Sequence, residues 1–224
     1  AILQAVQGPL PGDPYTAQPP ARPYTAELAA PGPRLRVGYT TRSPDPNIST
    51  QADCVTAVER SASLLRELGH QVEEAAPASW SSADDFQATM AHFMTAYGVW
   101  TAAELDRLAA MLGRPVTEQD VEPGTWLIAE PGRSANALDY LAAIEYFHRA
   151  SRDLAGFWSE RGYDLLLTPV MPEPPPPLGQ FHDPDNPLAG LLRSSQVVPF
   201  MAPFNISGQP AMSLPLHRSD AGLP

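Results

Sequence analysis

The segment between residues 34 and 76 follows a strand, helix and strand pattern, and this pattern constrains the fold more than any other feature. Residues 34–39 alternate in polarity as a strand does. A helix follows, and its apolar residues recur every three or four positions on one face: Val55, Val58, Ala62, Leu65 and Leu68. Gly69 ends this helix, and residues 70–74 form a second strand. The pattern predicts a right-handed βαβ unit with parallel strands.

The rest of the chain predicts further elements. We expect helices over residues 82–112, 118–130 and 136–160, an extended segment over 199–203, and strands over 163–168 and 211–214. Ser49 or Thr50 is the expected cap of the helix inside the βαβ unit, and Ser82 with Asp85 that of the next helix. Pro123 and Gly124 are expected to break the 118–130 helix. The 136–160 helix is expected to be the longest and to bury Ile144, Phe147, Ser151, Leu154 and Trp158. The apolar strand 163–168 suits a central position in a sheet.

Proline is unusually frequent, at 27 of 224 residues, and gathers in the first 46 residues and in 169–187. Residues 1–6 resemble the end of a helix, and residues 8–33 are predicted to be an extended surface segment. The run 172–177 favours a stiff loop over a docking segment for an aromatic groove.

Charge and composition exclude several classes of function. The formal net charge is −11, so contact with a phosphate backbone or an anionic membrane is disfavoured. No apolar run approaches the roughly 18 residues of a spanning helix, and no signal peptide is visible. Cys54 is the only cysteine, which rules out a disulfide within the chain and fits a cytoplasmic location.

Two groups of residues invite a chemical interpretation. Cys54 lies near the start of a helix, where the helix dipole would activate a thiol, but a small buried residue is the favoured interpretation. His182, Asp183, Asp185 and Asn186 could suggest a metal site, although the neighbouring prolines favour a turn. No nucleophile elbow and no phosphate-binding glycine loop is present.

Several segments together resemble the amidase signature family. They are the opening Leu3–Tyr15, the strand–helix–strand at 34–76, the strand Tyr163–Pro169 with its proline loop, and Pro203–Pro215. The order of these pieces resembles the later, C-terminal-side portion of that family. The stretch 115–134 resembles the branch that includes hydrolases of cyclic 6-aminohexanoate dimers. The implied fold class is α/β, with a partial mixed, twisted sheet flanked by helices.

The resemblance implies hydrolysis of carbon–nitrogen amide bonds by serine acyl transfer, without a cofactor or a metal. In that family a serine attacks the carbonyl, and a second serine relays its proton to a neutral, buried lysine. All 14 basic residues counted as Lys or Arg are arginine here, so no position can be the lysine. We therefore expect an extended segment over 1–33 and an incomplete amidase domain over 34–224, inactive in isolation, which supplies sheet and pocket wall.

The same resemblance places six residues beside the substrate cleft: Thr168, Met171, Val198, Phe200, Asn205 and Ser207. In relatives that act on glutamine, an Asp is expected about seven residues before the position of Asn205, where this chain has Val198. The missing acid favours a neutral or apolar amide as the small-molecule substrate. Neither a nucleic acid nor a membrane is an expected partner. Whether the protein forms a homodimer is left open by the sequence.

Two alternatives also stay open. The chain could be a non-catalytic, Rossmann-like binding module, because a βαβ unit is present and the triad is absent. It could also be a partner subunit of a split amidase, completed by a separate chain that carries the serines and the lysine.

Overall fold

The computed structural model describes residues 2–29, 32–183 and 185–223, and it divides into two compact units, residues 1–35 and residues 36–224. The first unit contains two short helices, α1 (Ile2–Val6) and α2 (Tyr24–Glu27). The Tyr24 N–H donates a hydrogen bond to the Gln4 side-chain carbonyl at 2.6 Å. The expected helix in residues 1–6 is therefore present. The expectation that residues 8–33 are extended throughout is wrong at α2, because Pro23 fixes φ at −54° and its carbonyl accepts from the Ala26 N–H at 2.9 Å.

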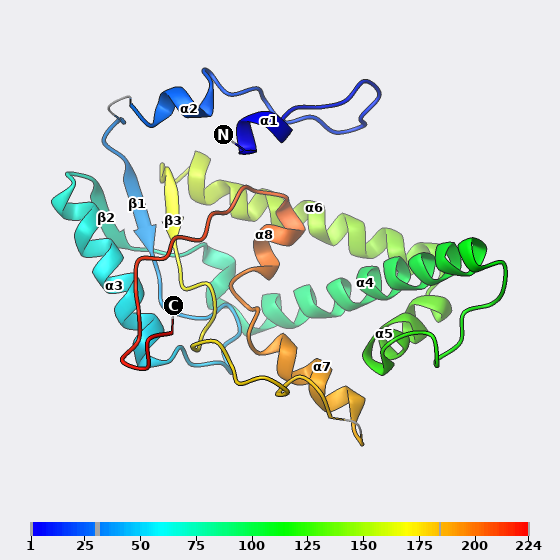
Figure 1. The fold of residues 1–224 in the computed structure, drawn as a ribbon. Helices are drawn as coiled ribbons and strands as arrows, with labels where there is room; N and C mark the ends of the chain where they lie inside the picture. Colours follow the sequence, from blue (N-terminus) through cyan, green and yellow to red (C-terminus); the bar gives the residue numbers. More distant parts are fainter. Residues whose placement is uncertain (1, 30–31, 184, 224) are drawn as a thin grey trace. The chain divides into compact units, whose positions relative to one another are not determined.

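The second unit is built on a three-stranded sheet (Figure 1). Its strands β1 (Arg36–Tyr39), β2 (Gln71–Glu74) and β3 (Leu165–Leu167) lie in the order β2-β1-β3 and all run parallel. Helix α3 (Ala52–Glu67) connects β1 to β2, so the βαβ prediction is confirmed. The α/β class with flanking helices is confirmed as well. Over these three strands the sheet is purely parallel, where the resemblance implied a mixed one.

Two strand predictions are corrected by the structure. The apolar strand expected to be central is β3, which pairs only with β1 in the described sheet and leaves Leu165 48% exposed. The central strand is β1 instead, where Val37 is 1% exposed. Residues 211–214 are not a strand, because a strand needs a hydrogen-bonded neighbour and the portion of the chain in the structure supplies none there.

The expected cap of α3 is also wrong. Gln51 occupies the N-cap position without a side-chain cap. The Thr50 hydroxyl instead donates to the Thr41 carbonyl at 2.6 Å, and the Gln51 N–H donates to the Pro172 carbonyl at 2.7 Å. These two hydrogen bonds connect the start of α3 to two loops. Thr50 and Gln51 therefore stabilise the packing of the loops against α3 and do not cap the helix with their side chains.

Helices of very different lengths accompany the sheet in the second unit (Figure 1). The elements are η1 (Ala78–Ser81), α4 (Ala83–Leu112), α5 (Pro123–Ser134), α6 (Ala137–Ser159), α7 (Pro187–Ser195) and α8 (Ala202–Ser207). Ser82 caps α4 by accepting from the Asp85 N–H at 3.1 Å, as predicted. Helix α4 has 30 residues and α6 has 23, so the expectation that α6 is the longest is wrong.

Prolines begin helices at two places where the sequence suggested otherwise. Pro123 was expected to break a helix, but it is the first residue of α5, where its missing N–H costs nothing. The segment 199–203 was expected to be extended, but it leads into α8, with Pro203 in the first turn. A proline fixes one backbone angle, and it favours the first helical turn as much as it disfavours the interior.

Among the described residues of the second unit, buried side chains form three clusters, one of them centred on Phe157 at the end of α6. Phe157 is 2% exposed and stacks on Tyr163 with ring centroids 4.4 Å apart. Within the predicted stripe of α6, Phe147 and Leu154 are buried, whereas Ile144, Ser151 and Trp158 are half-buried. The sequence pattern missed Ala143 and Phe157, which are buried.

Every helix within the described ranges is too short or too polar to span a membrane.

Candidate functional site

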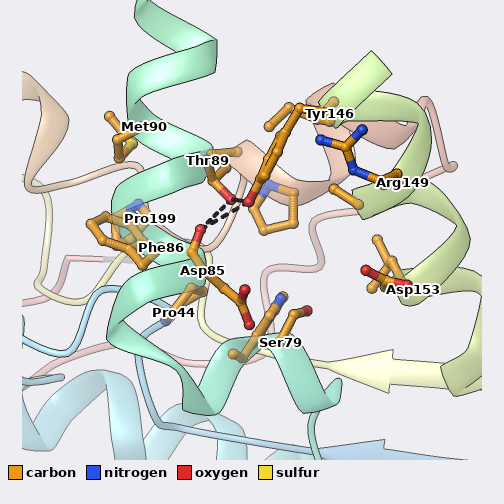
Figure 2. Close-up of a pocket in the computed structure, with 16 residues that line it drawn as sticks. Pro44, Ser79, Asp85, Phe86, Thr89, Met90, Tyr146, Arg149, Asp153 and Pro199 are labelled. Atoms are coloured by element: carbon orange, nitrogen blue, oxygen red, sulfur yellow. Dashed lines mark hydrogen bonds between the residues drawn. The ribbon is translucent and has the colours of Figure 1, made fainter. Parts of the chain in front are cut away.

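A cavity of about 220 Å³ lies among η1, α4, α6 and α8 (Figure 2). Most of its wall is apolar, contributed by Pro44, Trp80, Phe86, Met90, Ala150, Leu154, Pro199, Ala202, Pro203 and Ile206. The polar lining residues are Ser79, Asp85, Thr89, Tyr146, Arg149 and Asp153. A mostly apolar hollow with a few convergent polar groups is the usual character of a small-molecule site.

Five of the six polar lining residues, all except Ser79, fall into two sets. Thr89 and Tyr146 are half-buried, and their hydroxyl oxygens lie 2.8 Å apart between α4 and α6 (Figure 2). Asp85, Arg149 and Asp153 are exposed, and none of them forms an ion pair within the described ranges. The first set therefore belongs to the wall, and the second forms a charged, solvated rim.

None of the six predicted pocket residues lines this cavity. Phe200 is 1% exposed and contacts Trp80 edge-on, with ring centroids 6.4 Å apart, so it supports a wall residue from behind. Val198 is 39% exposed and Asn205 is exposed. Thr168, Met171 and Ser207 are half-buried. Neighbours in the same chain segment as Val198 and Ser207 do line the cavity: Pro199, Ala202, Pro203 and Ile206.

The sequence interpretation missed the contribution of α4 and α6 to the cavity. Thr89 and Tyr146 are 57 positions apart in the chain, and no short motif joins them. Tyr146 lies beside the buried Phe147 on α6, so a tyrosine at the edge of an apolar stripe was the one available signal. Only the packing of α4 against α6 brings the two hydroxyls together.

Cys54 lies half-buried in the first turn of α3. Burial raises the pKa of its thiol above the ordinary value, and the negative charges of Asp53 and Glu173 add to that rise. These causes oppose the activation that a helix N-terminus would give. Cys54 therefore fits the interpretation as a small packed residue.

We predict slow alkylation of Cys54. At pH 8 its reaction with iodoacetamide, followed by mass spectrometry of the peptide that contains it, should be roughly tenfold slower than that of a free thiol in solution. In denaturant the difference should disappear, because the burial and the neighbouring charges are then lost. A native rate above that of the free thiol would restore the activated-thiol interpretation.

The acidic residues near His182 form a turn. The Asp183 carboxylate accepts from the N–H groups of Asp185 and Asn186, each at 3.0 Å. Asn186 then caps α7 by accepting from the Ala189 N–H. Among the residues that the structure describes, no group of three or more His, Cys, Asp or Glu side chains is arranged to hold a metal ion.

Comparison with known proteins identifies the family to which this parallel sheet and its layer of helices belong. The family described as Amidase matches residues 1–224, so the chain belongs to the amidase family.

The chain is 30% identical to 6-aminohexanoate-cyclic-dimer hydrolases of Pseudomonas sp. (strain NK87) and Paenarthrobacter ureafaciens, over its whole length and 46% of theirs. A solved structure of a 6-aminohexanoate cyclic dimer hydrolase in complex with substrate superposes with a TM-score of 0.88, again over 100% of this chain and 46% of the other. A bacterial aryl acylamidase of the amidase signature family, 18% identical with a TM-score of 0.68, shares the fold. The chain thus spans about half the length of these relatives.

Proposed function

We propose that this chain is the C-terminal-side portion of an amide hydrolase that works by serine acyl transfer. The observation that supports the proposal most strongly is the whole-length match, in sequence and in fold, to enzymes named as hydrolases of a cyclic amide dimer. In this proposal residues 34–224 are an incomplete amidase domain that contributes sheet and pocket wall. The nucleophilic serine, the relay serine and the lysine come from residues outside it.

The composition of the cavity supports the proposal that this chain forms the pocket wall and that the catalytic residues lie outside it. Its lining contains one serine, Ser79, and no histidine, cysteine or lysine. An uncharged amine or imidazole is needed to draw the proton from a serine near neutral pH. The chain has no lysine at all, so in this proposal the lysine of the serine relay comes from elsewhere.

The apolar wall supports a role in holding the body of the substrate. Aromatic, proline and aliphatic side chains surround the hollow, while the charged residues are confined to its exposed rim. Burial of an apolar substrate in such a site is favoured by roughly 25 cal/mol per Å² of apolar surface. We place the predicted residues Thr168, Met171, Asn205 and Ser207 along the approach to the scissile bond.

The other expectations complete the proposal. The substrate is a small-molecule amide, the location is the cytoplasm, and a homodimer is the assembly to test first by light scattering. The alternatives of a binding module or a partner subunit are separated by reading the coding DNA upstream. An in-frame extension with a lysine and a Gly/Ser-rich loop supports the hydrolase, whereas a clean start codon supports a module or a subunit.

Substrate preference tests the proposed function. The complete protein should hydrolyse a neutral alkyl p-nitroanilide with a kcat/KM roughly tenfold above that for a cationic or a glutamine-like p-nitroanilide of the same length. The physical reason is the absence of a carboxylate at Val198, which is half-exposed beside buried Phe200. Preferred hydrolysis of the cationic or glutamine-like compound would contradict the proposal, and so would failure to hydrolyse any amide.

A substitution sharpens this test. Val198→Asp should shift the ratio of neutral to cationic kcat/KM toward the cationic substrate by roughly fivefold, since an added carboxylate attracts the cation. Leu192→Asp on α7 adds the same charge at another half-exposed apolar position and is the matched control. Equal shifts in both variants would show that only the overall charge matters.

A further inference from the structure

Three oxygen atoms meet in the wall of the cavity between α4 and α6. The Tyr146 hydroxyl donates to the Asp85 backbone carbonyl at 3.0 Å, and the Thr89 hydroxyl donates to the same carbonyl at 2.7 Å. The two hydroxyl oxygens are 2.8 Å apart (Figure 2). Both side chains line the cavity. This cluster is the polar part of a wall that is otherwise apolar.

The cluster has only two hydrogens for three mutual contacts. Both hydroxyls can donate to the Asp85 carbonyl, or one of them donates to the carbonyl while the other donates to its neighbouring hydroxyl. Each hydroxyl carries one hydrogen and two lone pairs. In each of these arrangements the hydrogens stay inside the cluster, so lone pairs remain for a ligand. The wall therefore presents hydrogen-bond acceptors.

The tyrosine is held in place before any ligand arrives. Its ring stacks on His92 with centroids 4.5 Å apart, and the Arg149 guanidinium lies 5.7 Å from the ring centroid. A fixed acceptor in an apolar wall discriminates strongly, because a buried polar group that lacks its partner loses the free energy of solvation without compensation.

We propose that Tyr146, supported by Thr89, selects substrates that carry a second, non-scissile amide N–H within the apolar part of the molecule. This proposal rests on the proposed function, in which the scissile bond is attacked from residues outside this chain and the cavity holds the rest of the substrate. A neutral N–H offers one donor to the acceptor cluster.

The test uses the complete protein and three neutral p-nitroanilides of equal acyl length. One acyl chain carries an internal secondary amide, the second carries the same amide N-methylated, and the third is plain alkyl. The wild-type protein should show a kcat/KM roughly tenfold higher for the secondary amide than for its N-methylated form. In Tyr146→Phe this ratio should fall to about one.

Controls separate recognition from folding. Tyr97→Phe makes the same chemical change on α4 at an exposed tyrosine outside the cavity lining and should keep the tenfold ratio. A loss of folding in Tyr146→Phe would lower all three rates together, whereas the proposal requires the ratio to change. An unchanged ratio in Tyr146→Phe, or a wild-type ratio near one, would overturn it.

The proposal can fail independently of the proposed function. If the complete protein hydrolyses none of the three anilides, the hydrolase assignment fails. Isothermal titration calorimetry then tests the acceptor cluster. The ligands are three primary alcohols whose chains match the acyl chains of the three anilides, and the measured quantity is their affinity for the complete protein. Tighter binding of the secondary amide, lost in Tyr146→Phe and kept in Tyr97→Phe, would support the cluster, and equal binding by wild type would refute it.

Discussion

Residues 1–224 produced alone should hydrolyse no amide above the buffer rate, while the complete protein turns over a neutral anilide. The difference is expected to be complete, because a serine in water at neutral pH keeps its proton unless a base removes it. No lysine is encoded in the chain, and no histidine or cysteine lines the cavity. Absence of the base removes the chemical step and not only substrate binding.

The location of the nucleophile gives a second readout that does not depend on how well the isolated chain folds. A fluorophosphonate, which forms a covalent adduct with an activated serine, should label the complete protein at a serine outside residues 1–224. Circular dichroism of the isolated chain shows whether its helices are formed. Robust turnover by residues 1–224, or an adduct on one of their own serines, would contradict the proposal that the nucleophilic serine lies outside these residues.

Gly132→Ala is expected to destabilise the protein by about 3 kcal/mol, at the upper end of the range for overpacking. Gly132 in α5 faces Gly98 in α4, and a Cβ atom at Gly132 would lie 2.0 Å from the Gly98 carbonyl carbon and oxygen. That contact is with backbone, which cannot rotate away. Helices α4 and α5 would have to separate, and the buried cluster of Ala102, Leu105 and Ala129 between them would open.

The measurement is the midpoint of urea unfolding of the complete protein. Gly156→Ala provides the matched control, because it lies within α6 and its added Cβ would lie 3.5 Å from the flexible Glu160 side chain. This control should be neutral or stabilising by up to about 1 kcal/mol, since alanine favours helix more than glycine does. Equal midpoints for Gly132→Ala and wild type would show that the two helices are not held in close contact.

Local pattern sufficed for several parts of the fold. The βαβ unit follows from alternation in the strands and from the apolar face of α3, and parallel pairing of β1 with β2 bears this out. The Ser82 cap of α4 was predictable because capping depends on residues three positions apart. Asn136 forms a capping box at the start of α6, which the sequence interpretation did not propose. The family could be inferred from the order of segments across the chain.

Prolines and strand neighbours were harder to interpret from the sequence. Pro123 is the first residue of α5 and Pro203 the second residue of α8. A proline in the first turn loses no hydrogen bond, and the sequence alone does not show where a helix begins. An apolar strand such as β3 is compatible with a central or an edge position. Which of the two occurs depends on the strands that pair with it, and those lie elsewhere in the chain.

The sequence by itself determined the helical and strand periodicities, the family, and the absence of a lysine that could act as base, because each of these is a property of residue types and short spacings. Only the tertiary structure decided where the cavity lies and that Thr89 and Tyr146 form its acceptor cluster. The physical reason is that the cavity and its cluster arise where separate helices pack, and the distance between two hydroxyls 57 positions apart is fixed by that packing and by no local preference.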